Sequence, residues 1–252
     1  MIGLVDTHCH LDDVRYAADR ADVIGRAAAA GVRALVVPGT AEDQWEAVRA
    51  LAAATSAVRL HAAVGTHPHE LPRTRAVPRD VSHVSAVGEC GLDGKTPVPM
   101  DEQVAVLAGH LGVARDAGLP VLLHCYKAHP AMLALLRRYA PVRGVLHSYS
   151  GGAELVDAYV ACGLHLSFAG AITWENARKP LDALRRVPLE RLLFETDGPD
   201  QCPRPHRGRN EPSFLPFIVA AAERVRGEPL ADVSIRNAID LGFGPWPLSA
   251  SS

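Results

Sequence analysis

Short apolar runs alternate with helix-length segments along the whole chain, and this alternation limits the fold more than any other feature. Eight runs rich in apolar and β-branched residues are typical of strands. They span residues 4–8, 34–37, 60–65, 85–89, 120–124, 143–147, 165–168 and 192–196. Between most of them, apolar residues recur at three- and four-residue spacing, which indicates amphipathic helices. Strand and helix are therefore predicted to alternate, as in α/β proteins with a parallel sheet.

The number of strand–helix units favours one closed architecture. Eight units in 252 residues match the usual size of a TIM barrel. A doubly wound open sheet is the alternative, but no glycine-rich phosphate-binding motif follows a strand, and polar residues end many strands rather than one pair. Because no low-complexity linker divides the chain, we predict an α/β fold, a TIM (β/α)8 barrel, with a single domain over residues 1–252.

Composition and charge argue against several classes of protein. The chain has 26 Lys and Arg against 28 Asp and Glu, a net charge of −2, which argues against a broad basic surface that coats nucleic acid. No long apolar segment or signal peptide is readable, so we expect a cytoplasmic protein without membrane contact. The five cysteines are scattered without CxxC spacing and are expected to be reduced. No feature indicates an obligate protein partner, and a monomer is expected.

Histidines and acidic residues stand at the ends of several predicted strands. Because strand side chains alternate, His8 and His10 project to the same face and can reach one metal ion, while Cys9 points away. The alternative for this pair is two hydrogen-bonded polar residues at a strand end. Four further candidates end the fourth, fifth, sixth and eighth strands: Glu89, His124, His147 and Asp197.

These six residues gain significance as a set. A buried strand gains little stability by ending in histidine or a carboxylate, and in a TIM barrel all such ends meet at the carboxyl rim, where active sites lie. Each histidine alone could be a satisfied buried residue. Four histidines and two carboxylates exceed the needs of one tetrahedral ion and suit two divalent metal ions, Zn²⁺, Mg²⁺ or Mn²⁺, that share a carboxylate or hydroxide bridge.

Seven ordered motifs resemble the signatures of a known family. The segments DTHCHL, GTHPHE, VGECGLD, LPVLLHCYKAH, LHSYSG, ETDGPD and RGRNEP are similar to those of the TatD-type metal-dependent hydrolases and deoxyribonucleases, a branch of the amidohydrolase superfamily. The resemblance implies a TIM barrel with a binuclear metal centre, in which the glutamate matching Glu89 commonly bridges the ions and the aspartate matching Asp197 is both ligand and proton acceptor. The implied ligands are His8, His10, Glu89, His124, His147 and Asp197.

The leading hypothesis is a metal-dependent hydrolase that cleaves phosphodiester bonds. Two cations flanking a water lower its pKa and stabilise charge on the phosphate oxygens. The expected enzyme is a DNase of the 3′–5′ exonuclease type that attacks single-stranded or damaged DNA with a metal-bridging hydroxide. Glu89 and Asp197 are the predicted catalytic residues, with Asp197 accepting the proton of the water.

Substrate contacts are predicted from two other motifs. His67 in GTHPHE is expected to contact phosphate or support the ligands, whereas His69 could serve only to cap or pack its loop. Arg207 and Arg209 belong to a basic cluster after the eighth strand and could hold a phosphodiester through two hydrogen bonds each. For Arg209, a pairing with Glu211 that fixes the loop is the slightly favoured alternative.

Two departures from the family pattern bear on the substrate. Tyr126 stands where an arginine is usual, so Lys127 is the candidate to replace that phosphate contact, and the loop at 94–99 is shortened. These departures and the net negative charge support a second hypothesis, a small-molecule ester, lactone or amide hydrolase. Glu89, in place of the modified lysine that bridges metals in many such enzymes, favours the nuclease. A non-catalytic barrel would be expected to lack at least one ligand, and none is missing.

Overall fold

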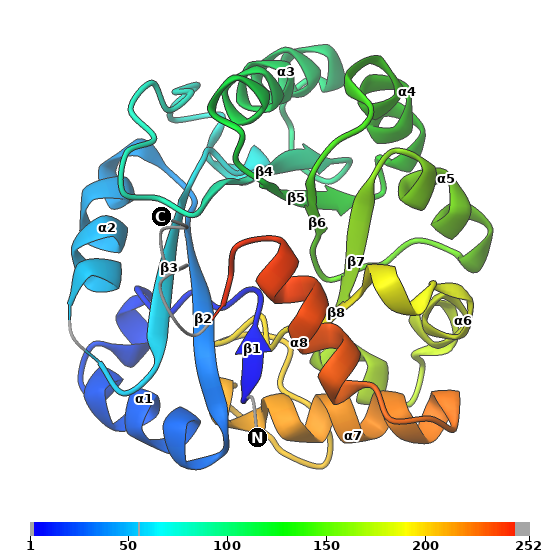
Figure 1. Ribbon diagram of the computed structural model, residues 1–252. Helices are drawn as coiled ribbons and strands as arrows, with labels where there is room; N and C mark the ends of the chain where they lie inside the picture. The colour runs from blue at the N-terminus through cyan, green and yellow to red at the C-terminus, as the bar shows by residue number, and fades with distance from the viewer. Residues whose placement is uncertain (1–2, 55, 245–252) are drawn as a thin grey trace, which may run out of the picture.

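The protein folds into a barrel of parallel strands surrounded by helices (Figure 1). The computed structural model describes residues 3–54 and 56–244, so both ends of the predicted 1–252 domain lie outside the described residues. The eight strands are hydrogen-bonded in sequence order, and the backbone N–H of Thr7 donates to the carbonyl of Phe194 at 3.3 Å, which joins the end of the first strand to the last. The predicted TIM barrel is confirmed, and the doubly wound alternative is excluded.

All eight predicted strands are present, although several end earlier than expected. Their bounds are β1 (Leu4–Asp6), β2 (Val32–Gly39), β3 (Arg59–Val64), β4 (Ala86–Asp93), β5 (Val121–Tyr126), β6 (Gly144–Leu146), β7 (Leu164–Phe168) and β8 (Leu192–Phe194). The helices are α1 (Arg20–Ala29), α2 (Trp45–Ala53), α3 (Met100–Ala117), α4 (His129–Tyr139), α5 (Val156–Ala161), α6 (Arg178–Arg186), α7 (Leu215–Arg226) and α8 (Ala231–Asp240). Glu89 and His124 therefore lie within strands, whereas His8, His147 and Asp197 follow just after strands end.

The alternation of strand side chains builds two apolar layers. Residues on one face of the strands pack against the helices, and Cys9, Cys90 and Cys125 are buried free thiols in this outer layer. Residues on the other face fill the barrel interior, where Leu241 and Phe243 join them from the segment after α8. In the view of Figure 1, α8 crosses in front of the barrel. The interior is thus a packed core at one end, which leaves the other end for polar groups.

One glycine sets the close approach of the two strands that carry central site residues. A Cβ atom at Gly91 of β4 would lie 2.0 Å from the carbonyl oxygen of His124 in β5. Only a residue without a side chain allows this spacing. Gly91 therefore helps to bring Glu89 and His124 to the same point of the rim.

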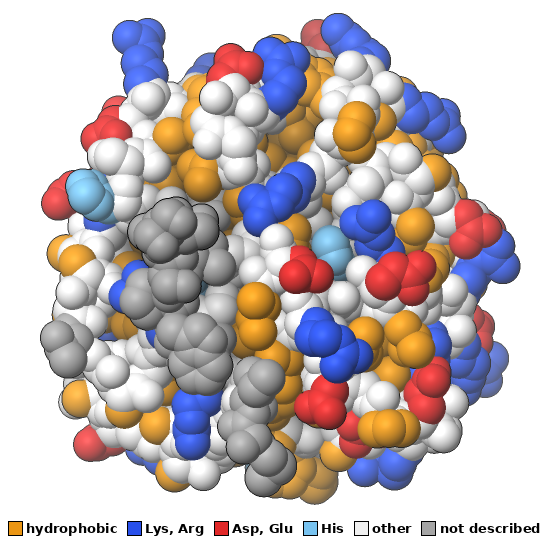
Figure 2. Space-filling view, in the orientation of Figure 1, with side chains coloured by type: hydrophobic (Ala, Val, Ile, Leu, Met, Phe, Trp, Pro, Cys, Tyr) orange, Lys and Arg blue, Asp and Glu red, His pale blue; other side chains and the backbone are white. Residues whose placement is uncertain are grey.

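The distribution of charged side chains on the surface agrees with the near-neutral net charge of the chain. On the face in Figure 2, basic and acidic side chains are interspersed, with no single-sign field over its described part. None of the described helices combines the length and the apolar character needed to cross a membrane.

Candidate metal centre

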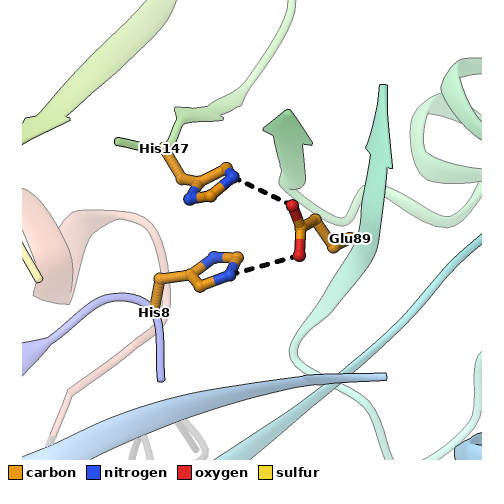
Figure 3. A group of neighbouring side chains, drawn as sticks. All are labelled: His8, Glu89 and His147. Carbon is orange, nitrogen blue, oxygen red and sulfur yellow. Dashed lines mark ion pairs between the residues drawn. The ribbon is translucent and has the colours of Figure 1, made fainter. Parts of the chain in front are cut away.

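Glu89 lies at the middle of the rim, and its two carboxylate oxygens face different groups of histidines. Oε2 lies 3.3 Å from Nε2 of His8 and 3.5 Å from Nε2 of His10. Oε1 lies 2.9 Å from Nε2 of His147 and 3.3 Å from Nδ1 of His124. Figure 3 shows His8 and His147 pointing at opposite oxygens of the same carboxylate. One side chain therefore joins two potential ligand sets.

Two more residues complete these sets. Oδ1 of Asp197 lies 3.8 Å from Nε2 of both His8 and His10. Nε2 of His67 lies 3.3 Å from Oε1 of Glu89, on the side of the other histidines. We name them by their members: the first ligand set is His8, His10, Asp197 and Oε2 of Glu89, and the second ligand set is His67, His124, His147 and Oε1 of Glu89. The structure thus brings all six sequence-predicted ligands together and adds His67.

The spacing of the donor atoms fits bound metal ions. Ligands held at about 2.0–2.1 Å by a tetrahedral ion are separated from each other by about 3.3 Å. The Nε2 atoms of His8 and His10 are 3.3 Å apart, as are Nδ1 of His124 and Nε2 of His147. Imidazole nitrogens with carboxylate oxygens are the donors that zinc and similar divalent ions take. The residues present are therefore suited to divalent metal binding.

Outer carboxylates orient two of the histidines. Nδ1 of His147 lies 3.3 Å from Oε1 of Glu195, which also accepts the backbone N–H of Ser148 at 2.6 Å. Nε2 of His124 lies 3.2 Å from Oδ2 of Asp93. A carboxylate behind a ligating imidazole fixes both the ring orientation and the nitrogen that carries the proton. Glu195 and Asp93 thus turn His147 and His124 so that their other nitrogens face Glu89.

Glu89, His8 and His67 have the protonation states that metal binding requires. Burial by itself would raise the pKa of Glu89, but the facing imidazoles, His147 and His67 foremost, hold it well below its usual range. Burial lowers the pKa of His67 to about 3 and also lowers the pKa of His8. An ionised carboxylate and neutral imidazoles leave free lone pairs on the donor atoms. The pKa of His124 and His147 is instead raised, by Asp93 and Glu89 for His124 and by Glu89 and Glu195 for His147, so a metal ion would have to displace a proton from each ring.

Comparison with known proteins places the chain in a family. The sequence profile of the family described as TatD related DNase matches residues 5–239, nearly the full length of the barrel. This chain belongs to the TatD family. The resemblance seen in the ordered sequence motifs is therefore confirmed.

Relatives of the TatD family match over almost their whole length. A protein of Bacillus subtilis named uncharacterized metal-dependent hydrolase YabD is 32% identical over 249 residues, 93% of this chain and 97% of the relative. The 3′–5′ ssDNA/RNA exonuclease TatD of Erwinia amylovora is 32% identical over 258 residues, 94% of this chain and 97% of the relative. The crystal structure of YjjV, a TatD homolog from Escherichia coli, has a TM-score of 0.88 and 32% identity, with 97% and 98% of the two chains covered. The protein is thus a TatD-family metal-dependent hydrolase.

The four residues predicted to contact substrate lie in different places in the structure. His67 lies at the metal centre. Lys127 is exposed just after β5, with Nζ 5.5 Å from the centre of the Tyr126 ring, and Arg207 is exposed in the loop after β8. The guanidinium of Arg209 donates to both carboxylate oxygens of Asp19 at 2.8 and 2.7 Å.

The expected pairing of Arg209 with Glu211 is wrong. Glu211 instead pairs with Arg26 of α1 at 2.7 Å, while Arg209 holds Asp19. These contacts tie the loop after β8 to α1 because the barrel closes there, next to the first helix. Arg209 and Asp19 lie 190 residues apart along the chain, so the sequence around the loop does not indicate that they pair.

A cavity that the sequence reasoning missed opens beside the metal centre. This side cavity has a volume of about 800 Å³, and His124, His147 and Asp197 form part of its wall. Other parts of its wall come from the end of β5 and from the segment after β7: Tyr126, Trp174, Arg178 and Lys179. The available signal was the segment WENARK, in which an aromatic and two cations follow a predicted strand. Loops after the seventh and eighth strands of TIM barrels often bind phosphate.

Proposed function

We propose that this protein is a nuclease that hydrolyses phosphodiester bonds of single-stranded DNA in the 3′–5′ direction with two divalent metal ions. The observation that carries the proposal is the position of Glu89, whose two oxygens each face one ligand set. The relatives named as 3′–5′ ssDNA/RNA exonucleases support the choice of substrate.

The two ligand sets would each hold one ion. His8, His10 and Asp197 with Oε2 of Glu89 would bind the first, and His67, His124 and His147 with Oε1 of Glu89 would bind the second. When bound, such ions would act as Lewis acids on the phosphodiester and would lower the pKa of the attacking water.

The chain's own residues position the reactants and move the proton. Asp197 has one oxygen directed at His8 and His10, and its Oδ2 accepts a hydrogen bond from the side-chain amide of Gln201. Because Asp197 also lines the side cavity, this second oxygen can accept the proton of the attacking water while the substrate occupies the cavity. Gln201, which also donates to Ser148 Oγ at 2.6 Å, holds the carboxylate in this orientation.

Cleavage of labelled oligonucleotides tests the proposal. The protein is stripped with EDTA, reloaded with Mg²⁺, Mn²⁺ or Zn²⁺, and incubated with a single strand labelled at its 5′ end. A ladder that shortens from the 3′ end is expected, and Asp197→Asn should slow it by about 10²–10⁴-fold. Absence of cleavage above the Asp197→Asn background with every metal would refute the nuclease.

A small-molecule ester, lactone or amide hydrolase is the second candidate, favoured by Tyr126. Its ring lines the side cavity where the family pattern has an arginine, so that one expected guanidinium is replaced by an uncharged surface. Turnover of carboxylic esters or lactones far above that of phosphodiesters by the same metal-loaded protein would reverse the ranking.

A further inference from the structure

Two aromatic rings are exposed in the side cavity. Trp174 is 41% exposed and Tyr126 is 40% exposed, and both line this cavity. The indole of Trp174 is anchored, because its Nε1 donates to the carbonyl of Cys202 at 3.0 Å. Folding normally buries such rings, so that their exposure beside a reaction centre leaves flat apolar faces available to a ligand. A planar ring system is the ligand that such faces favour most.

Two cations lie on the same cavity wall. Arg178 and Lys179 are exposed in the first turn of α6, and this first turn contains no acidic residue. The ion pairs found on the described part of α6 involve its last turn, where Arg185 contacts Asp182 and Arg186 contacts Asp157. Cations at the first turn oppose the helix dipole, so their position costs stability unless an anion is bound nearby. The cavity therefore has attraction for an anionic group as well as for a flat ring.

The side cavity is continuous with the metal centre. His124, His147 and Asp197 belong to both, so a molecule in the cavity touches the ligand sets directly. Its volume of about 800 Å³ falls within the range of about 300–1,000 Å³ found for small-molecule sites. A space of this size has room for one nucleotide.

We propose that the side cavity is a subsite for one unpaired nucleotide adjacent to the cleaved bond, with its base stacked on Trp174 and Tyr126 and its phosphate contacted by Arg178 and Lys179. This inference rests on the proposed nuclease function and specifies how that nuclease recognises its substrate. The enzyme selects single-stranded ends because a base must leave its partner to enter the cavity. Replacement of the usual arginine by Tyr126 then exchanges a phosphate contact for a base contact.

Removal of bases from the substrate tests the subsite. Two single strands are compared that differ only in the last two residues, which carry their bases in one strand and are abasic in the other. The wild-type enzyme should cleave the abasic strand about 5- to 100-fold more slowly, as expected for the loss of base–aromatic stacking. Trp174→Ala should reduce the preference, and the double variant Trp174→Ala/Tyr126→Ala should cleave both strands at the same reduced rate. Trp174→Phe should restore the preference.

Matched variants separate this effect from general damage. Phe217→Ala removes an aromatic that is 48% exposed but does not line the cavity, so it should keep the wild-type preference. Lys179→Gln should raise KM and weaken its salt dependence, whereas Arg185→Gln on the exposed far end of the same helix should change neither. Equal cleavage of the two strands by the wild-type enzyme would overturn the subsite and leave the nuclease function standing.

A binding measurement keeps the subsite testable if the nuclease function fails. Deoxyadenosine 5′-monophosphate is titrated by calorimetry into the wild-type protein and into Trp174→Ala, with and without Mn²⁺. Binding that Trp174→Ala weakens at least about fivefold supports the subsite even when no strand is cleaved. Absence of binding, or equal binding by both proteins, overturns it.

Discussion

Histidines are buried at both ends of the barrel, but in the described part of the chain the ion pairs to carboxylates belong to the histidines at the rim and not to His61 or His165 at the opposite end. We call the end opposite to the rim, where Leu241 and Phe243 pack, the base of the barrel. His61 and His165 are buried there, and the ring nitrogens of His61 lie 2.9 Å from Ser85 Oγ and 2.8 Å from the carbonyl oxygen of Gly244. Burial lowers the pKa of His165 to about 4. At the rim, burial also opposes the charge of His147, but Glu89 and Glu195 raise its pKa well above the usual value. Burial of a histidine is therefore a poor sign of function, and the groups that face it are decisive.

The two ends of the barrel also differ in the polarity of the residues around these histidines. The base is closed by Leu241 and Phe243, which pack into the apolar interior of the barrel. The rim concentrates imidazoles and carboxylates, whose burial costs free energy unless each is paired or bound to metal. In TIM barrels the base maintains stability and the rim carries chemistry. Substitutions at the two ends should therefore separate stability from activity.

Glu89→Gln should have the largest effect, because it removes the charge that both ligand sets share. Cleavage should fall by at least about 10³-fold, since both the ions and the charge stabilisation they provide are affected. Metal content, measured by plasma mass spectrometry after dialysis, should fall as well. The control Glu190→Gln alters an exposed carboxylate. Wild-type metal content together with a wild-type rate in Glu89→Gln would contradict the assignment of the centre.

Phe243→Ala should lower the stability of the protein without changing its catalytic rate. It empties a fully buried position at the base, which costs about 3–5 kcal/mol of unfolding free energy in urea titrations. The rate per folded molecule should stay unchanged, because Phe243 is remote from the ligand sets. Phe217→Ala removes a half-exposed ring that packs on His206 and Phe214, and it should lower the unfolding free energy by only about 0.5–1.5 kcal/mol. A loss of rate without a loss of stability in Phe243→Ala would show that the ends are coupled.

Substitution of the outer carboxylates should have an intermediate effect. Glu195→Gln or Asp93→Asn leaves every ligand in place but weakens the hydrogen bond that orients His147 or His124. Metal affinity should drop by about 10–100-fold, as measured by competition with a chromophoric chelator. The exposed Asp116 serves as a control through Asp116→Asn. Unchanged affinity in both variants would mean that the two histidines are held by packing alone.

The base should produce a modest pH dependence of stability. The pKa of His165 is about 4 in the folded protein and about 6.5 when unfolded, so the unfolded state binds more protons between these values. Stability should therefore decrease as the pH falls from 6.5 towards 4. His165→Gln should flatten this decrease in melting temperatures recorded in EDTA, which excludes effects of bound metal. Identical slopes for both proteins would assign the dependence to other groups.

Much of the fold and of the ligand sets was predictable, because both depend on local periodicity. Alternating apolar runs specify strands, and polar residues at their ends specify a rim once the strands are parallel. The ends of strands were less predictable. The strand expected at residues 192–196 ends at Phe194, and shortly after it the backbone N–H of Thr196 donates to the carboxylate of Asp6 instead of to a backbone carbonyl. The pairing of Arg209 with Asp19 depends on closure of the barrel and has no local sequence signal.

The order of residues along this chain determines the alternation of strand and helix, the apolar layers and the positions of the candidate ligands. Tertiary structure alone decides that one Glu89 carboxylate lies between two groups of histidines, that Asp93 and Glu195 orient two of them, and that Trp174 borders the same cavity. The physical reason is the distance along the chain over which each kind of interaction acts. Periodicity and strand propensity act over a few residues, whereas ligand geometry requires atoms from six separate strand ends to meet within a few ångströms, which only the closed barrel enforces.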